Sequence, residues 1–270
     1  MDLKSRIIDL YRKAATELPA DVVDALKGAY EQETDPTPKE VLATILENLS
    51  LAKGEAIPIC QDTGTPLFYV KDDGSIPRGE LRKIIEAATE TATAEVPLRP
   101  NGVDIITGKN IGNRPIIHFE EADRFGIDLF LKGGGSENVS AVYAIPSTEI
   151  NADRSLDGAR TCVLDCMVKA QGRGCSPYVV GVAVAGGIEE VAHLSKKQLL
   201  RKISDVNPVP ELRSFEERTL KEINQLGIGP LGLGGRSTAL AVKAAVAPRH
   251  PACFFVGVSV GCWALRRHSL

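Results

Sequence analysis

Three cysteines of this chain stand at breaks in regular structure, with polar residues or glycine as neighbours, a setting typical of thiolate metal ligands. Cys60 lies in the segment 57–65 (IPICQDTGT), where an amide, a carboxylate and a hydroxyl follow it directly. Cys175 and Cys262 lie in similar short segments that contain glycine or proline. Because ionisable neighbours are costly to bury without a use, this setting favours function over packing. Three converging thiolates would suit a metal or iron–sulfur site with one open position.

The other three cysteines have apolar neighbours. Cys162 and Cys166 are four residues apart, so they share one face of a predicted helix over 156–171. Cys253 precedes two phenylalanines at the start of a predicted strand. These three are interpreted as core residues. Since the sequence has no C-x-x-C pair, spacing alone leaves open whether Cys60, Cys175 and Cys262 bind metal.

Composition indicates an ordinary soluble globular protein. The 270 residues are 43% apolar and 25% charged, enough for a single domain 1–270 with one or two lobes. The net charge of −3 gives no electrostatic reason to expect a nucleic acid or an anionic membrane as partner. The basic pairs Lys196-Lys197 and Arg266-Arg267 are interpreted as solvated surface.

The cysteine content and the N-terminus indicate the compartment. Six cysteines are too few for a small disulfide scaffold. The first residues lack the apolar core of a signal peptide, and no apolar stretch reaches the roughly 18 residues of a membrane span. We therefore expect a reduced, cytoplasmic protein that contacts no membrane.

The elements that must position these residues follow from hydrophobic periodicity. The fold class is predicted as α+β (mixed α/β), with a largely helical N-terminal third and intermixed strands and helices after it. In that first third, Thr37 is the expected N-cap of a helix that runs to about Leu51, with Pro38 in its first turn. Further helices are predicted over 78–93, 156–171, 191–202 and 210–225, and strands over 56–59, 67–70, 116–119, 127–132, 178–185, 239–246 and 254–260.

Several separated motifs together resemble one family, the iron–sulfur hydro-lyases of the class I fumarase and tartrate dehydratase group, in their α subunit or N-terminal domain. The motifs span most of the chain in the family's order: 59–64 (ICQDTG), 97–101 (PLRPN), 132–138 (KGGGSEN), the turn at Cys175, 228–235 (IGPLGLGG), 249–252 (RHPA) and 261–267 (GCWALRR). One departure is visible, because the family usually has two prolines after the middle cysteine and this chain has Ser176-Pro177.

The resemblance implies a [4Fe–4S] cluster held by Cys60, Cys175 and Cys262. The fourth iron would have no protein ligand and would act as a Lewis acid on the substrate. The implied reaction is the reversible hydration of fumarate to L-malate, a step of the tricarboxylic acid cycle. The closest alternative is an L(+)-tartrate dehydratase, which applies the same chemistry to a dihydroxy acid.

The resemblance also implies roles for the polar residues of these motifs. Asp62 and His250 are the expected catalytic residues, with Asp62 in proton transfer. For Asp62 the alternative is an Asx turn that only shapes the loop. Binding of the dicarboxylate substrate is expected from four residues: Gln61, Arg99, Gly134 and Gly135.

In this family a further part of the active site belongs to a C-terminal domain or β subunit. Because the sequence stops three residues after Arg267, we expect that part from a second polypeptide, in an α2β2-type assembly. Two other readings stay open: a closed zinc site built from the three cysteines and His250, and a non-catalytic regulatory relative. A nucleotide site at the glycine-rich segment 227–235 is not favoured, because it lacks the Lys-Ser/Thr pair of a phosphate loop.

Overall fold

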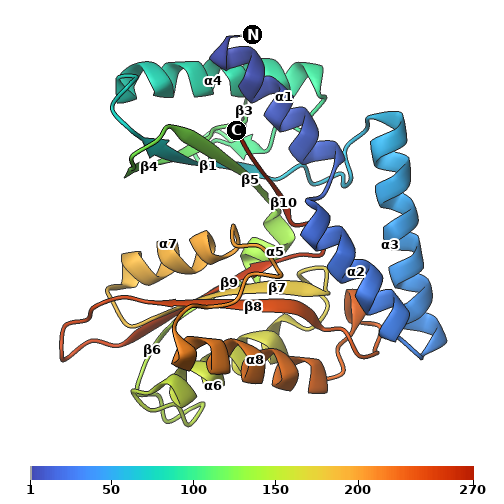
Figure 1. Ribbon diagram of the computed structural model, residues 1–270, viewed down its shortest axis with the longest axis vertical. Helices are drawn as coiled ribbons and strands as arrows, with labels where there is room; N and C mark the ends of the chain where they lie inside the picture. Colours follow the sequence, from blue (N-terminus) through green and yellow to red (C-terminus); the bar gives the residue numbers. More distant parts are fainter. Residues whose placement is uncertain (1) are drawn as a thin grey trace. The chain divides into compact units, whose positions relative to one another are not determined.

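The computed structural model describes residues 2–270 and divides the chain into two compact units, each discontinuous in sequence. The first unit contains the residues up to Pro19, Glu47–Gly134 and Ala264–Leu270, and the second contains Ala20–Leu46 and Gly135–Trp263. The elements, labelled in Figure 1, are α1 (Leu3–Thr16), α2 (Ala20–Gln32), α3 (Pro36–Glu55), β1 (Thr65–Asp72), α4 (Arg78–Glu95), β2 (Gly102–Val103), β3 (Asn110–Gly112), β4 (Ile116–Glu121), β5 (Gly126–Lys132), α5 (Gly134–Asn138), β6 (Ala141–Ala144), α6 (Leu156–Ala170), β7 (Tyr178–Val184), α7 (Ile188–Gln198), α8 (Pro210–Gln225), η1 (Pro230–Gly232), β8 (Ala239–Val246), β9 (Phe255–Gly261) and β10 (Arg266–Ser269).

The first unit is a four-stranded sheet covered by helices. Its strand order is β10-β5-β1-β4, with β1 parallel to β4 and antiparallel to β5. Helices α1 and α4 pack against each other and over the sheet (Figure 1). The Asp2 side chain begins α1 by accepting a hydrogen bond from Ser5 N at 2.7 Å. Apolar side chains of α1, α4, β1 and β5 form the core, among them Ile7, Tyr11, Phe68, Ile85 and Leu129.

The second unit is a sheet between two layers of helices. Its strand order is β6-β9-β7-β8, with β7 parallel to β8 and antiparallel to β9. Helix α7 packs on β7 and β9 on one face, and α6 and α8 lie on the other (Figure 1). Glycine lets α7 approach closely, because a Cβ at Gly181 would lie 2.1 Å from Ser195 O.

The predicted α+β class and the helical N-terminal region are confirmed. Helix 210–225 and strand 239–246 have the predicted bounds, and the predicted strand at 67–70 lies within β1. The strand predicted at 56–59 is wrong, because α3 continues to Glu55 and no ladder forms there. Strands β2, β3, β6 and β10 were not predicted. No helix among residues 2–270 is both long and apolar enough to cross a membrane.

The start of α3 also differs from the prediction. The helix begins at Pro36, so Thr37 lies inside it and is not its cap. The preceding Asp35 accepts a hydrogen bond from Thr37 N at 3.2 Å. Asp35 caps the helix and Pro36 is its first residue. Asp35-Pro36 therefore meets the capping requirement two residues before Thr37-Pro38.

The solvated surface expected at Arg266-Arg267 is likewise wrong. Arg266 is 1% exposed and Arg267 is 8% exposed. Both belong to β10, which pairs antiparallel with β5 so that Arg266 stands opposite Leu131. Backbone hydrogen bonds with β5 make Arg266–Ser269 an edge strand of this sheet, although its side chains are polar.

Candidate metal and substrate site

The segment that carries Cys60 is fixed from both sides in the first unit. Before the cysteine, Ile59 N donates to Ala15 O at 2.9 Å, and Asn48 Nδ2 donates to Ile59 O at 3.0 Å. After it, Gly64 has φ +84°, and a Cβ there would lie 2.8 Å from the carbonyl carbon of Leu131. Only glycine fits that position. The half-buried Cys60 therefore sits on a loop of defined shape.

Asp62 is the most connected residue of this loop. Its Oδ1 accepts from Gly64 N at 3.0 Å, which is the Asx turn considered above. Its Oδ2 accepts from Gly134 N at 2.7 Å. Its main-chain carbonyl accepts from Arg266 Nη1 at 2.6 Å. The carboxylate thus shapes the loop and is also held toward the glycine segment that follows β5.

Arg99 is joined to the Cys60 loop through Thr63. Thr63 is 3% exposed, and its Oγ1 accepts from Arg99 N at 3.0 Å. On the other side, Asn113 Nδ2 donates to Arg99 O at 3.0 Å. Asn101 adds a bond from Nδ2 to Gly64 O at 3.1 Å. The main chain of Arg99 is therefore fixed, while its side chain is exposed.

The second unit places Cys175 beside the residue that follows Cys262. Cys175 has φ +61° and is exposed, and its carbonyl accepts from Trp263 N at 3.1 Å. Tyr178 lies at the same turn, where its hydroxyl accepts from Gly174 N at 3.1 Å. Burial raises the pKa of Tyr178, and the nearby Cys175 and Cys262 add to the rise. The bond from Trp263 N to Cys175 O therefore brings the segment after Cys262 to the Cys175 turn.

Ser176, the departure from the family pattern, has a structural role of its own. Its Oγ donates to Gly229 O at 2.6 Å, and Leu231 N donates to Ser176 O at 2.9 Å. The Cys175 turn is thereby tied to the glycine-rich segment around η1. A hydroxyl takes the place of the expected proline ring without removing a thiol.

His250 and Gln61 are both exposed. His250 Nδ1 accepts from Ala252 N at 3.1 Å, so the neutral ring carries its proton on Nε2. Arg249 Nη1 donates to Pro251 O at 2.8 Å and stabilises the same turn. The histidine is oriented by main-chain contacts, and its Nε2 is the nitrogen open to a ligand.

The predicted site residues divide between the units. Around one loop, the first unit brings together Cys60, Gln61, Asp62, Arg99 and Gly134. The second unit contains Gly135, Cys175, His250 and Cys262, of which Cys175 is bonded through its carbonyl to the residue that follows Cys262. The convergence of all nine on one site is a proposal.

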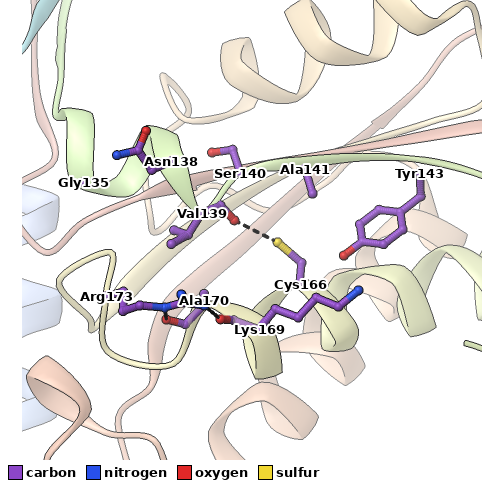
Figure 2. Close-up of a pocket in the computed structure, with 10 residues that line it drawn as sticks. All are labelled: Gly135, Asn138, Val139, Ser140, Ala141, Tyr143, Cys166, Lys169, Ala170 and Arg173. Carbon is purple, nitrogen blue, oxygen red and sulfur yellow. Dashed lines mark hydrogen bonds between the residues drawn. The ribbon is translucent and has the colours of Figure 1, made fainter.

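A cavity of about 390 Å³ in the second unit contains one predicted residue, Gly135. Figure 2 shows its other walls, including Tyr143, Cys166 and Lys169. The charged groups there are engaged by the protein, since Lys169 pairs with Asp165 at 2.8 Å and Arg173 donates to Lys169 O. The cavity therefore offers no uncommitted cation to a dicarboxylate.

Two of the cysteines interpreted as core are indeed buried. Burial raises the pKa of Cys162 to about 11 and that of Cys166 to about 12, with Asp165 adding to both. These two stay protonated at neutral pH and are poor metal ligands. Cys60, Cys175 and Cys262 are not buried, and none is in a disulfide. Within either unit, no three His, Cys, Asp or Glu side chains among residues 2–270 gather to hold a single metal ion.

Sequence reasoning missed three residues that shape the first loop: Thr63, Asn101 and Arg266. All three lie inside the motifs quoted above, but the motifs do not indicate which residues they contact. A threonine and an asparagine beside glycine or proline are typical of loops in general. Nothing in their spacing indicates that Thr63 meets a residue 36 positions away.

Comparisons with known proteins point to one family. The chain matches the family model described as fumarate hydratase (Fumerase) over residues 4–270. A putative class I fumarate hydratase of Geobacillus stearothermophilus is 41% identical over 277 residues, which cover 98% of this chain and 54% of that protein. A putative L(+)-tartrate dehydratase subunit alpha of Methanocaldococcus jannaschii is 39% identical over 279 residues, which cover 99% of this chain and 96% of that protein. The L(+)-tartrate dehydratase subunit alpha of Escherichia coli K12 is 36% identical over 265 residues, which cover 95% of this chain and 86% of that protein.

Proposed function

The chain belongs to the fumarate hydratase family of hydro-lyases, and we propose that it is the α-type part of a [4Fe–4S]-dependent fumarate hydratase. Its substrate is a small dicarboxylate, its reaction the reversible hydration of fumarate to L-malate. It works in the cytoplasm with a β-type partner, in an α2β2 assembly. The family relationship supports this proposal, since the chain spans about half of the Geobacillus relative and nearly all of a protein described as an alpha subunit.

One observation carries the proposal: a thiol outside any disulfide, a carboxylate and an arginine are held in one hydrogen-bonded loop system. Cys60 and Asp62 are two residues apart, and Thr63 Oγ1 binds the main chain of Arg99. Gly134 N holds Asp62 Oδ2 at 2.7 Å. Metal binding, proton transfer and carboxylate binding are different tasks, and a fixed loop is what all three require.

The residues fit the proposed cluster by the chemistry of their donors. Cys60, Cys175 and Cys262 are unburied thiols outside any disulfide, and they are the ligands we propose. When bound, such a cluster supplies an iron without a protein ligand, which acts as a Lewis acid toward carboxylate and hydroxyl oxygens.

Arg99 and Gln61 bind the substrate carboxylates in this proposal. The Arg99 side chain is exposed on a main chain that Thr63 and Asn113 hold, so its guanidinium can pair with a carboxylate in a bidentate geometry. Gly134 N holds Asp62 Oδ2 at 2.7 Å, which brings the main chain of this glycine segment to the carboxylate. Gly135, the next residue, lets the substrate approach the main chain.

Asp62 moves the proton between the substrate carbon and its carboxylate. The amides of Gly64 and Gly134 fix the direction of both oxygens, which is the orientation that general acid–base catalysis needs. His250 offers the proton on Nε2 to a carboxylate or to a proton-transfer partner, because its Nδ1 is bound to Ala252 N.

L(+)-tartrate dehydration is the second candidate. It is favoured by the alpha-subunit relative of Methanocaldococcus jannaschii, which this chain covers to 96% of its length at 39% identity. Both reactions use the same proposed residues. Side-by-side turnover of fumarate, L-malate and L(+)-tartrate by the complex of this chain with its β-type partner separates them.

The first test is the content of iron and acid-labile sulfide in protein purified without oxygen. About four of each per chain, with a brown chromophore that bleaches in air, is the expected result. Stoichiometric zinc without sulfide in such protein would contradict the proposal and favour a closed structural site. A loaded complex that turns over none of the three acids would point instead to a regulatory relative.

A further inference from the structure

Arg266 is a buried cation that the proposed mechanism does not use. It is 1% exposed, and its side chain is the largest among the fully buried ones. The hydrogen bond that this side chain makes within residues 2–270 runs from Nη1 to the main-chain carbonyl of Asp62 at 2.6 Å. Its Nε is buried without a hydrogen-bond partner in that part of the chain.

This arrangement is unfavourable for the protein alone. A buried guanidinium is normally stabilised by a carboxylate, whereas the bonded partner of the Arg266 side chain is a neutral main-chain carbonyl. The Asp62 carboxylate does not neutralise it through hydrogen bonds, because its two oxygens bind the amides of Gly64 and Gly134.

The buried charge lies next to the loop that carries a proposed metal ligand. Asp62, whose carbonyl Arg266 binds, is two residues from Cys60. A cluster with thiolate ligands and a bound dicarboxylate brings negative charge to this loop. An uncompensated cation at the loop is unfavourable before that charge arrives and favourable afterwards.

We propose that Arg266 is a positioning residue for the loop 60–64: it holds the Asp62 carbonyl and stabilises the loop when Cys60 carries a negatively charged cluster. The inference rests on the proposed function and goes beyond it, because it assigns a task to a residue outside the ligand and substrate sets. It also explains why a fully buried arginine lies at the start of β10.

The proposal predicts effects of opposite sign on two forms of the same chain. Arg266→Met keeps the length of the side chain and removes its charge. In the cluster-free full-length chain, the melting temperature should be equal to or higher than that of the wild type, because an unpaired buried charge is gone. In the loaded chain, release of iron to a chelator should be about tenfold faster, the scale seen when groups around metal ligands are removed.

Two further variants separate this role from ordinary packing. Arg266→Lys retains the charge and should release iron at a rate between those of the wild type and Arg266→Met. Arg201→Gln is the matched control, because Arg201 is a half-buried arginine paired with Asp205 at 2.7 Å and Glu216 at 2.8 Å. It should lower the melting temperature and leave iron release unchanged.

The reduction potential of the cluster gives an independent readout. Loss of a nearby positive charge disfavours the more negative reduced state, so Arg266→Met should shift the potential to a more negative value and Arg266→Lys should not. A melting temperature that falls with Arg266→Met as it does with Arg201→Gln, or iron release at the wild-type rate, would overturn the inference. A wild-type chain that assembles no cluster would overturn the proposed function instead.

Discussion

The loops around Cys60 and Cys175 are stabilised in different ways. The Cys60 loop depends on polar side chains: Asn48, Asp62 and Thr63 each bind main-chain atoms of this loop or of Arg99. The Cys175 turn has φ +61° at the cysteine and a carbonyl bonded to Trp263 N, and the side chains that fix it are hydroxyls, those of Ser176 and Tyr178.

This difference indicates which of the two loops has a task beyond supplying a proposed cluster ligand. A carboxylate such as that of Asp62 can shape a loop and also take part in proton transfer, whereas the hydroxyls of Ser176 and Tyr178 bond main-chain atoms and fix the turn. We therefore expect the Cys60 loop to govern substrate binding and proton transfer, and the Cys175 turn to govern cluster attachment. The predictions that follow test this division.

Removing a thiol from either loop should have the largest effect and should be the same for both. Cys60→Ser and Cys175→Ser should each lose the chromophore, and turnover should fall about a thousandfold or more, because several kcal/mol of transition-state stabilisation is lost. Iron content and activity of the assembled complex measure this. Cys162→Ala is the control and should retain iron. Full iron content in only one of the two serine variants would show that the loops do not share a cluster.

Gly64→Ala should be the most destabilising change in the first loop that leaves all thiols in place. The new Cβ meets the Leu131 carbonyl carbon at 2.8 Å at φ +84°, so we expect a loss of about 2–4 kcal/mol. Urea unfolding measures the loss. Gly134→Ala is the matched control, since its Cβ meets only Asp62 Oδ2, at 3.7 Å. Equal unfolding midpoints for the two variants would contradict the close approach described here.

Thr63→Val tests whether the first loop positions Arg99, the arginine proposed to bind substrate. It keeps the shape of a buried side chain and leaves Arg99 N without its acceptor, a loss of about 1–3 kcal/mol. KM for the dicarboxylate should rise about tenfold or more while iron content is unchanged. Thr91→Val is the control, because the Thr91 hydroxyl donates to Ala87 O within α4. An unchanged KM would separate Arg99 from the Cys60 loop.

Ser176→Ala should have the smallest effect and should act on the second turn alone. It removes the buried hydrogen bond from Ser176 Oγ to Gly229 O. The free energy of unfolding should therefore fall by about 1 kcal/mol. Ser204→Ala, an exposed position, should change it by less than about 0.5 kcal/mol. If Ser176→Ala raised KM as much as Thr63→Val does, the Cys175 turn would also govern substrate binding, and the two loops would not differ in this respect.

The fold could be predicted where the sequence pattern was strong and local. The apolar runs of β7 and β8 and the periodic helix α8 stand out by themselves. Strand β10 could not be predicted, because Arg-Arg-His-Ser has no strand pattern and becomes a strand only through pairing with β5. Thr37-Pro38 misplaced the start of α3, since Asp35-Pro36 provides an equivalent signal two residues earlier.

The site could be predicted as a set of motifs but not as a network. Cys60, Cys175 and Cys262 stood out through their polar or glycine-rich neighbours. The contacts of Thr63 with Arg99 and of Arg266 with Asp62 join residues far apart in sequence, and no local pattern encodes them. Arg266 was misread because a basic pair near a terminus usually lies on the surface.

The discontinuity of the first unit has a consequence for biosynthesis. All of the segment 135–263 is translated between β5 and its partner β10. Until β10 emerges, the apolar strand β5 is an open sheet edge that can pair with other nascent chains. Ribosome-bound chains halted before residue 264 should therefore recruit chaperones or aggregate more than chains that include β10, which co-sedimentation can measure.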